Sequence, residues 1–127
     1  DMNSGDKTWS LPVGETRAEI REHPLLQGVA IPNSGGVGYS IQMVMGDILV
    51  QARALSEGAA QLTPDAPLML NARDKTTGEI LGSVPLPAPA QYGMMTYQHN
   101  GRQYIVVQVG SFQTNYPGAL VAYRLPL

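Results

Sequence analysis

The sequence predicts an all-β fold, a partial β-propeller with one short helix, and three observations lead to this prediction. The 14 glycines and 10 prolines are about 19% of the 127 residues, against roughly 12% in average proteins, which indicates many turns and few long helices. Short segments rich in β-branched and aromatic residues alternate with turn residues. A turn pattern that ends in Ser-Gly or Thr-Gly occurs twice.

The clearest strand signal is Asn100-Gly101, which separates two β-rich segments. Asn-Gly is typical of a two-residue hairpin turn, because both central positions of a type I′ turn need a positive φ. We expect Gly46-Asp47 to form a second hairpin turn. The Ala-, Gly- and Pro-rich stretch 53–67 is predicted to be a loop. The predicted strands lie near residues 38–45, 47–53, 68–73, 79–84, 94–98, 102–109 and 118–124, with residues 7–11 as a further outer strand.

One short helix is expected in the first third of the chain, from Glu15 to His23. Thr16 is a candidate N-cap, with Glu19 three residues later at the capping-box position. Pro24 is expected to end the helix, because proline cannot donate the next backbone hydrogen bond. Ile20 is expected to face the core, which would give the helix an inner and an outer side.

Composition and charge exclude several classes of function. The formal net charge of −2 argues against a nucleic-acid binder, because that function needs a basic face. No apolar segment reaches the roughly 18 residues of a membrane-spanning helix. The chain has no cysteine, which excludes disulfides, thiolate catalysis and cysteine-based metal sites. The 43% of apolar residues suffices for a core, so composition predicts one turn-rich domain and no particular function.

A local pattern that begins with Asp occurs twice. Residues Asp1–Trp9 read D-x-x-S-G-x-x-x-W, and residues Ala72–Gly82 read A-x-D-x-x-T-G-x-x-x-G. In each copy the Asp can accept hydrogen bonds from the turn backbone, and the Gly can adopt a positive φ. Trp9 is expected to dock against a neighbouring blade. A generic hairpin turn would explain one copy, but two copies flanked by strands in the order that a blade needs favour a propeller.

The predicted strands divide the chain into four segments. They are the outer strand of a preceding blade (1–12), a linker with the short helix (13–35), a complete four-stranded blade (36–85) and an incomplete last blade (86–127). This is about one and three-quarter blades, whereas a closed ring needs about four or more. We therefore expect the chain, which starts at Asp1 rather than Met, to be the C-terminal piece of a longer protein. Its partners would be the remaining blades of that parent chain, and the isolated fragment would self-associate through exposed blade faces.

Three stretches of the chain resemble the quinoprotein dehydrogenases, which use pyrroloquinoline quinone (PQQ). The repeated turn is similar to their A-x-D-x-x-T-G-x-x-x-W docking motif. Residues 93–107 are similar to the P-M-T-Y-x-x-x-G-K-Q-Y-V-V run near the C-terminus of the membrane glucose/quinate dehydrogenase branch, and residues 120–126 resemble the closing segment of that branch. The resemblance implies an eight-bladed ring in the periplasm, with PQQ on the propeller axis beside Ca²⁺ and a small alcohol or sugar as substrate.

The resemblance also implies a set of cofactor-binding residues. Gly35 and Gly36 occupy the place of a Gly-Gly pair that opens an inner strand, where the missing Cβ lets a flat ligand approach the backbone. Gly110, Ser111 and Phe112 occupy the place of a Gly-Gly pair followed by His or Trp. The catalytic Asp and the Ca²⁺ ligands of the family come mainly from earlier blades. No catalytic or metal-binding residue is therefore assigned to this segment.

Two functions remain for the parent protein. The first is a PQQ-dependent oxidoreductase acting on an alcohol or a sugar, in which this fragment is not catalytic alone. The second is a non-catalytic propeller, a scaffold or binding module that has lost the cofactor. Departures from the family pattern favour the second: Ser111 and Phe112, Gly82 in place of a docking Trp, and the loop 53–67 in place of a short connection. A weaker third possibility is an independent small β domain that self-associates. We expect the first, and the sequence upstream of Asp1 would separate it from the second.

Overall fold

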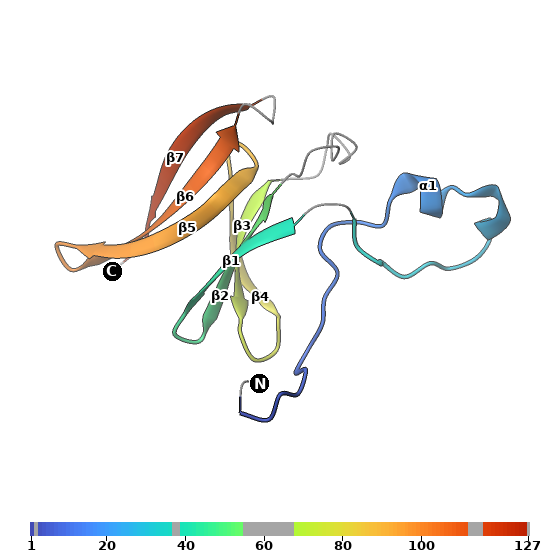
Figure 1. The fold of residues 1–127 in the computed structure, drawn as a ribbon, viewed down its shortest axis with the longest axis horizontal. Coiled ribbons are helices and arrows are strands. Elements are labelled where there is room, and N and C mark those ends of the chain that lie inside the picture. Colours follow the sequence, from blue (N-terminus) through green and yellow to red (C-terminus); the bar gives the residue numbers. More distant parts are fainter. Residues whose placement is uncertain (2, 37–38, 55–67, 112–115, 127) are drawn as a thin grey trace.

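The computed structural model describes residues 1, 3–36, 39–54, 68–111 and 116–126. Within these residues the chain forms two antiparallel meanders, in which each strand pairs with the next (Figure 1). The first meander contains β1 (Tyr39–Met45), β2 (Ile48–Ala54), β3 (Met69–Asp74) and β4 (Ile80–Pro85). The second contains β5 (Ala90–His99), β6 (Arg102–Ser111) and β7 (Tyr116–Arg124). One parallel Cα pair, Ala54 with Ala90, joins β2 to β5. The prediction of an all-β fold is confirmed.

The observed strands lie close to the predicted ones, with differences at a few places. β2 runs to Ala54, into the predicted loop 53–67, of which residues 55–67 lie outside the described part of the chain. The turn between β5 and β6 is as expected, since Asn100 has a φ of 49° and Gly101 a φ of 72°. β5 begins at Ala90 rather than near residue 94, because pairing with β6 continues past an irregularity between Ala90 and Met94. Residues 7–11 form no strand, since a strand needs a hydrogen-bonded neighbour and no described strand pairs with them. Their place in a preceding blade stays a prediction.

The two copies of the repeated pattern form the same turn. The N–H of Gly5 donates to the carbonyl of Asp1 at 2.8 Å, and the N–H of Gly78 donates to the carbonyl of Asp74 at 2.8 Å. In both copies the N–H two residues after the Asp donates to its carboxylate at 2.7 Å. Gly5 and Gly78 both have a φ of 78°, which L side chains rarely adopt. The sequence repeat is therefore a structural repeat.

The Asp74 carboxylate is held by backbone donors of its own turn. It accepts the N–H of Thr77 at 2.9 Å and the N–H of Thr76 at 2.7 Å. These two hydrogen bonds, that from Thr77 first, hold the pKa of Asp74 below its usual range. The carboxylate contributes to stability above the pKa that it has in the unfolded chain, and the contribution is lost as the pH falls through its folded-state pKa.

Trp9 docks on the turn between β3 and β4, as predicted. Its Nε1 donates to the carbonyl of Lys75 at 2.9 Å, and a Cβ added at Gly78 would lie 2.9 Å from the Trp9 ring. The Lys75 ammonium in turn lies 2.8 Å from the Asp47 carboxylate and donates to the Gly46 carbonyl at 2.9 Å. The N-terminal segment is thereby linked to both turns at the lower edge of the first meander (Figure 1).

Substitution of Trp9 tests this docking. Trp9→Phe keeps an aromatic ring against Gly78 but removes the indole N–H, and we expect the free energy of unfolding to fall by about 1 kcal/mol. Trp9→Ala also removes the packing, and we expect a loss of about 2–3 kcal/mol. Urea unfolding followed by far-UV circular dichroism measures both, since Trp9 is the only tryptophan of the chain and fluorescence would be lost with it. Equal stability of Trp9→Ala and the unsubstituted chain would show that the segment is not docked in solution.

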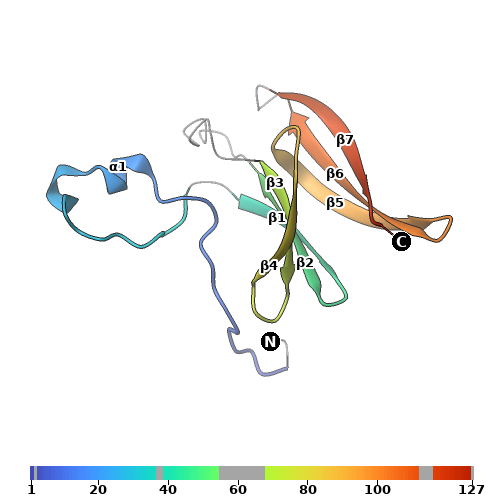
Figure 2. The ribbon, with the colours of Figure 1, turned by 180° about the vertical axis from the view of Figure 1, so that it is seen from behind.

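The predicted helix is shorter than expected. The structure has α1 (Ala18–Arg21) and a 3₁₀ turn, Pro24–Leu26, in place of one helix from 15 to 23. Thr16 is not the N-cap, because its side chain makes other contacts and no side chain caps this helix. Ile20 is 41% exposed and does not face the core. Four residues cannot present a continuous apolar face, and the segment lies away from both meanders (Figures 1 and 2).

A polar clasp closes the loop that carries α1. The Thr16 hydroxyl accepts the N–H of Ser34 at 2.8 Å, and the Thr16 N–H donates to Oδ1 of Asn33 at 2.9 Å. The Asn33 amide nitrogen donates to the carbonyl of Gly14 at 2.9 Å. Thr16 is only 3% exposed, so these hydrogen bonds satisfy a buried polar side chain. The clasp holds residues 14–16 against residues 33–34.

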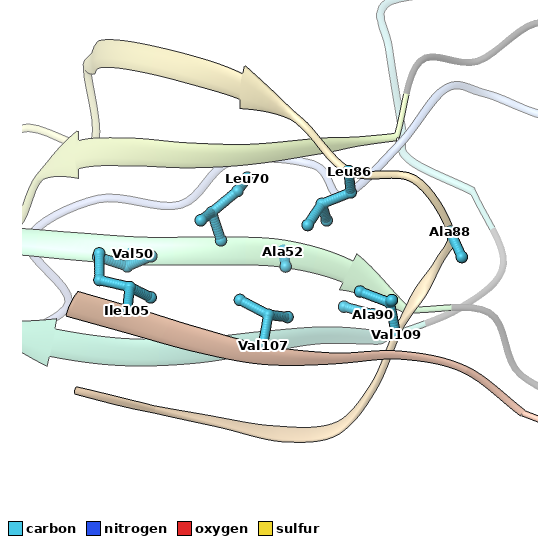
Figure 3. Packing of buried hydrophobic residues seen from close by; sticks show 9 residues of the cluster. All are labelled: Val50, Ala52, Leu70, Leu86, Ala88, Ala90, Ile105, Val107 and Val109. Atoms are coloured by element: carbon cyan, nitrogen blue, oxygen red, sulfur yellow. The ribbon is translucent and has the colours of Figure 1, made fainter. Parts of the chain in front are cut away.

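The hydrophobic core lies between the two meanders (Figure 3). One face of β2 and β3 packs against one face of β6, and the connection from β4 to β5 closes the end of the core at the right of Figure 3. Ala52 and Ala90 are fully buried, and their small side chains allow β2 and β5 to approach closely. The buried apolar residues are Val50, Ala52, Leu70, Leu86, Ala88, Ala90, Ile105, Val107 and Val109.

Tyr123 links the end of the second meander to the first. From β7 its hydroxyl donates to the carbonyl of Pro85, the last residue of β4, at 2.6 Å. Partial burial raises the pKa of Tyr123 above its usual value. The neutral phenol is therefore the form that the folded chain favours.

This contact predicts a sensitivity to alkali. A group whose folded-state pKa is raised contributes stability below its unfolded-state pKa, about 10 for tyrosine, and the contribution is lost as the pH rises through the folded-state pKa. Tyr123→Phe should cost about 0.5–1 kcal/mol at neutral pH, because one exposed hydrogen bond is lost. Above about pH 10 the unsubstituted chain should lose more stability than the Phe variant. Urea unfolding at two pH values tests this, and equal losses would contradict it.

Candidate functional site

Each of the seven described strands has one end at the same edge of the two meanders, the upper edge in Figure 1. The Cα partners Tyr39–Ala54, Ala54–Ala90 and Ala90–Val109 join the starts of β1 and β5 to the ends of β2 and β6. The pair Ser111–Tyr116 adds the start of β7. We define the upper edge as residues 33–36, Tyr39, 53–54, 86–93, 109–111 and 116–118.

The predicted cofactor-binding residues lie at this edge. The structure brings Gly35 and Gly36 to the approach to β1, and Gly110 and Ser111 to the end of β6. Phe112 lies outside the described residues. The structure therefore places predicted residues from two distant segments of the sequence at the same edge of the fold. Their contact with a cofactor stays a prediction.

The glycine pair packs against the segment that precedes the loop. A Cβ at Gly35, whose φ is 83°, would lie 3.1 Å from the carbonyl oxygen of Val13. A Cβ at Gly36 would lie 2.7 Å from the carbonyl oxygen of Glu15, which is closer than real Cβ contacts. The Gly36 N–H donates to the Val13 carbonyl at 2.8 Å. The missing side chains are thus needed for packing within the chain itself.

Arg53 places a cation beside the glycine pair. A Cβ at Gly14 would lie 2.6 Å from the Arg53 guanidinium, and one at Gly36 would lie 3.3 Å from it. Partial burial lowers the pKa of Arg53, and the charge of Glu15 acts in the opposite direction. The guanidinium nevertheless stays protonated at any physiological pH. The chain therefore presents a fixed positive charge where β2 ends.

Gly110 makes the sharp change of direction at the end of β6. Its φ is 64°, and a Cβ here would lie directly against the carbonyl oxygen of Pro117. Its N–H donates to the carbonyl of Pro89 at 2.8 Å. Ser111, which follows, is buried and pairs with Tyr116. As at the first glycine pair, the space beside Gly110 is filled by the chain itself.

Three exposed tyrosines that were not among the predicted site residues also stand at the upper edge. Tyr39 begins β1, Tyr92 lies near the start of β5 and Tyr116 begins β7. All three rings are exposed. A sequence signal existed, because each tyrosine stands next to glycine or proline where a strand begins. The edge therefore offers aromatic faces to a ligand, which small-molecule sites commonly use.

The upper edge carries few charged side chains. Among its described residues Arg53 is the one cation, and the Glu15 carboxylate, which belongs to the neighbouring segment, acts on it. No three His, Asp or Glu side chains come together as a metal cluster in the described part of the chain. None of the helices found among residues 3–36, where all described helices lie, is long and apolar enough to cross a membrane. The exposed aromatic rings suit the edge to a planar ligand.

The chain is similar in sequence to a known protein family and to several curated proteins. Residues 1–105 match the family described as "PQQ: Glucose/ethanol/alcohol dehydrogenase, beta-propeller domain". The chain is 31% identical over 133 residues to the glycerol dehydrogenase large subunit of Gluconobacter thailandicus, covering 99% of this chain and 16% of that protein. It is 32% identical over 129 residues to quinoprotein glucose dehydrogenase A of Acinetobacter calcoaceticus, covering 99% of this chain and 14% of that protein.

A shorter alignment has a higher sequence identity. Over 60 residues, 45% of this chain and 8% of the relative, it is 43% identical to the quinoprotein glucose dehydrogenase of Escherichia coli (strain K12). No solved structure gives a significant match to the chain. The chain spans about one sixth or less of the curated relatives described above. The match to the family covers residues 1–105, which is more than half of the chain and includes both copies of the repeated turn and the first meander. The chain therefore belongs to the β-propeller family of PQQ-dependent glucose, ethanol and alcohol dehydrogenases, and its two meanders are part of such a propeller.

Proposed function

We propose that this chain is the C-terminal propeller part of a longer, periplasmic PQQ-dependent oxidoreductase that acts on an alcohol or a sugar, and that it is not catalytic alone. The observation that carries the proposal is its alignment, over 99% of its length, with relatives named glycerol dehydrogenase and glucose dehydrogenase. The chain matches only about one sixth of those proteins or less, so the remaining blades would supply the catalytic Asp and the Ca²⁺ ligands.

The upper edge fits PQQ, which is a flat ring system that carries carboxylates. The exposed rings of Tyr39 and Tyr92 offer flat apolar surfaces, and the Arg53 guanidinium offers a positive charge. The charge of the neighbouring Glu15 acts on Arg53 and offsets part of this positive charge. The glycines would contribute less directly to cofactor binding, since the positions where a Cβ would lie face other parts of the chain. They would act by holding the edge in shape.

This chain would bind and orient, and the chemistry would lie elsewhere. PQQ, when bound, supplies the two-electron acceptor for oxidation of the substrate. Arg53 would fix one carboxylate of the cofactor by charge, and the tyrosine rings would exclude water from one of its faces. The packed core between the two meanders would hold both contributions in a fixed relation.

The surfaces that the chain leaves open support the remaining blades as partners. On the second meander, the face away from the core carries Tyr97 and Tyr104, whose rings stack with centroids 5.0 Å apart. Met95 and Leu120 are exposed on the same face, given their register with Val106 and Gln108. An apolar sheet face of this kind is typical of a surface covered by another layer. In the isolated chain it would promote self-association.

Titration of PQQ into the full-length gene product tests the proposal. We expect stoichiometric binding, followed by reduction of an artificial electron acceptor when glycerol or glucose is added. The 127-residue chain, run in parallel, should show no turnover. Absence of PQQ binding by the full-length protein would overturn the proposal. It would then favour the second candidate, a non-catalytic propeller, to which the filled space beside Gly36 and Gly110 points.

A further inference from the structure

Tyr92 has a backbone conformation that is unusual for its residue type. Its φ is 59°, and among the described residues only Asn100 is another non-glycine with a positive φ. Asn100 needs that conformation for the hairpin turn, and asparagine tolerates it well. A bulky aromatic residue in a strand does not, so this conformation carries a cost to stability. Tyr92 therefore calls for a reason other than turn geometry.

The conformation belongs to a bulge in β5. Ala90 pairs with Val109 and Met94 with Val107, so three residues of β5 lie opposite one residue of β6. Within the bulge Gln91 is 1% exposed, whereas Tyr92 is 61% exposed. The bulge thus buries one side chain and turns the next one outward. Bulges that redirect a side chain are common beside active sites.

The bulge stands at the convergence of the two meanders. Ala90, two residues before Tyr92, is the residue that pairs with Ala54 at the end of β2, and Ala54 pairs with Tyr39 of β1. β1 and β5, the first strands of the two meanders, lie side by side. The ring of Tyr92 is exposed at this point rather than at the outer rim.

We propose that Tyr92 is a ligand-facing residue of the cofactor site and contacts the flat ring of the quinone in the assembled protein. The inference rests on the proposed function. The β5 bulge turns the aromatic ring outward at the upper edge, which also carries Arg53. The unfavourable φ is compatible with this role, because ligand-contacting residues often keep strained backbone conformations.

Three variants of the full-length protein separate this role from a merely structural one. Tyr92→Gly fits the positive φ and should unfold at a temperature equal to or higher than that of the wild type, yet bind PQQ about 3- to 10-fold more weakly. Tyr92→Asn, which also tolerates the conformation, should show the same weakening. Tyr92→Phe keeps the ring and should retain the affinity within about twofold. Binding is read by titration of PQQ into apoprotein, without substrate.

The outcomes distinguish the two proposals. If the wild-type protein binds PQQ and Tyr92→Gly binds it within twofold of the wild type, the role of Tyr92 is overturned and the proposed function stands. If the wild-type protein does not bind PQQ, the proposed function is overturned and this inference with it. If Tyr92→Gly and Tyr92→Asn are weaker while Tyr92→Phe is not, the ring is the group that contacts the cofactor.

Discussion

Substitution of Val107 by aspartate is expected to separate the two meanders, and to lower the free energy of unfolding of the 127-residue chain by about 4 kcal/mol or more. Val107 is 0% exposed and stands in the middle of β6, where it faces β2 and β3 across the core (Figure 3). A carboxylate at this position would be removed from water without a partner. Because an uncompensated buried charge is so unfavourable, the two sheets should part rather than enclose it.

Val44→Asp is the matched control for this experiment. The same change of side chain is made on β1, at a residue that is 63% exposed. Only the lower strand propensity of aspartate acts there, so we expect a loss below about 1 kcal/mol. Urea unfolding followed by far-UV circular dichroism compares the two variants. Equal losses would mean that the interface between the meanders does not hold the chain together in solution.

The strands could be predicted because their signals are local. Asn100-Gly101 determines its own turn, since few other residue pairs adopt a positive φ at both positions. The repeat at Asp1 and Asp74 could be predicted for the same reason, because each Asp binds the backbone of the next few residues. In such cases the residues that decide the structure are neighbours in the sequence.

The helix prediction was wrong because the residues that decide the structure of this segment are distant in the sequence. The hydroxyl of Thr16 resembles an N-cap within its own segment, but it donates to the side chain of Asn33 and accepts the N–H of Ser34, 17 and 18 residues away. With its cap removed, a segment with so short a helical stretch forms only one turn. Tertiary contact overrode local preference, as it does for any weak helix.

The sequence indicated which glycines lie at one edge of the fold but not what they contact, and their role toward a cofactor stays a prediction. Gly35, Gly36 and Gly110 fall at one edge because the order of strands in a meander puts them there. What lies against each glycine is a long-range contact, which no local pattern reveals. The β5 bulge was missed for the same reason, since nothing in Gln91-Tyr92-Gly93 alone indicates that pairing with β6 resumes at Ala90.

Substitution of Gly110 by alanine is expected to destabilise the chain by about 3 kcal/mol or more, through two effects that can be separated. The first is the positive φ of 64°, which costs an alanine about 1–2 kcal/mol. The second is steric, because the new Cβ would lie directly against the carbonyl of Pro117, and backbone cannot yield as a flexible side chain does. Relief would require movement of β7 and would weaken the hydrogen bond to Pro89.

Gly101→Ala isolates the first effect. Gly101 has a similar φ of 72° in the same meander, but a Cβ there would meet nothing within 4 Å. The control should therefore lose only about 1–2 kcal/mol, and the excess loss in Gly110→Ala measures the close approach of β6 to Pro117. Chemical unfolding of both variants gives the difference directly. If the two losses agree within about 0.5 kcal/mol, Gly110 is kept by its backbone angle alone, and the space beside it at the upper edge is open to a ligand after all.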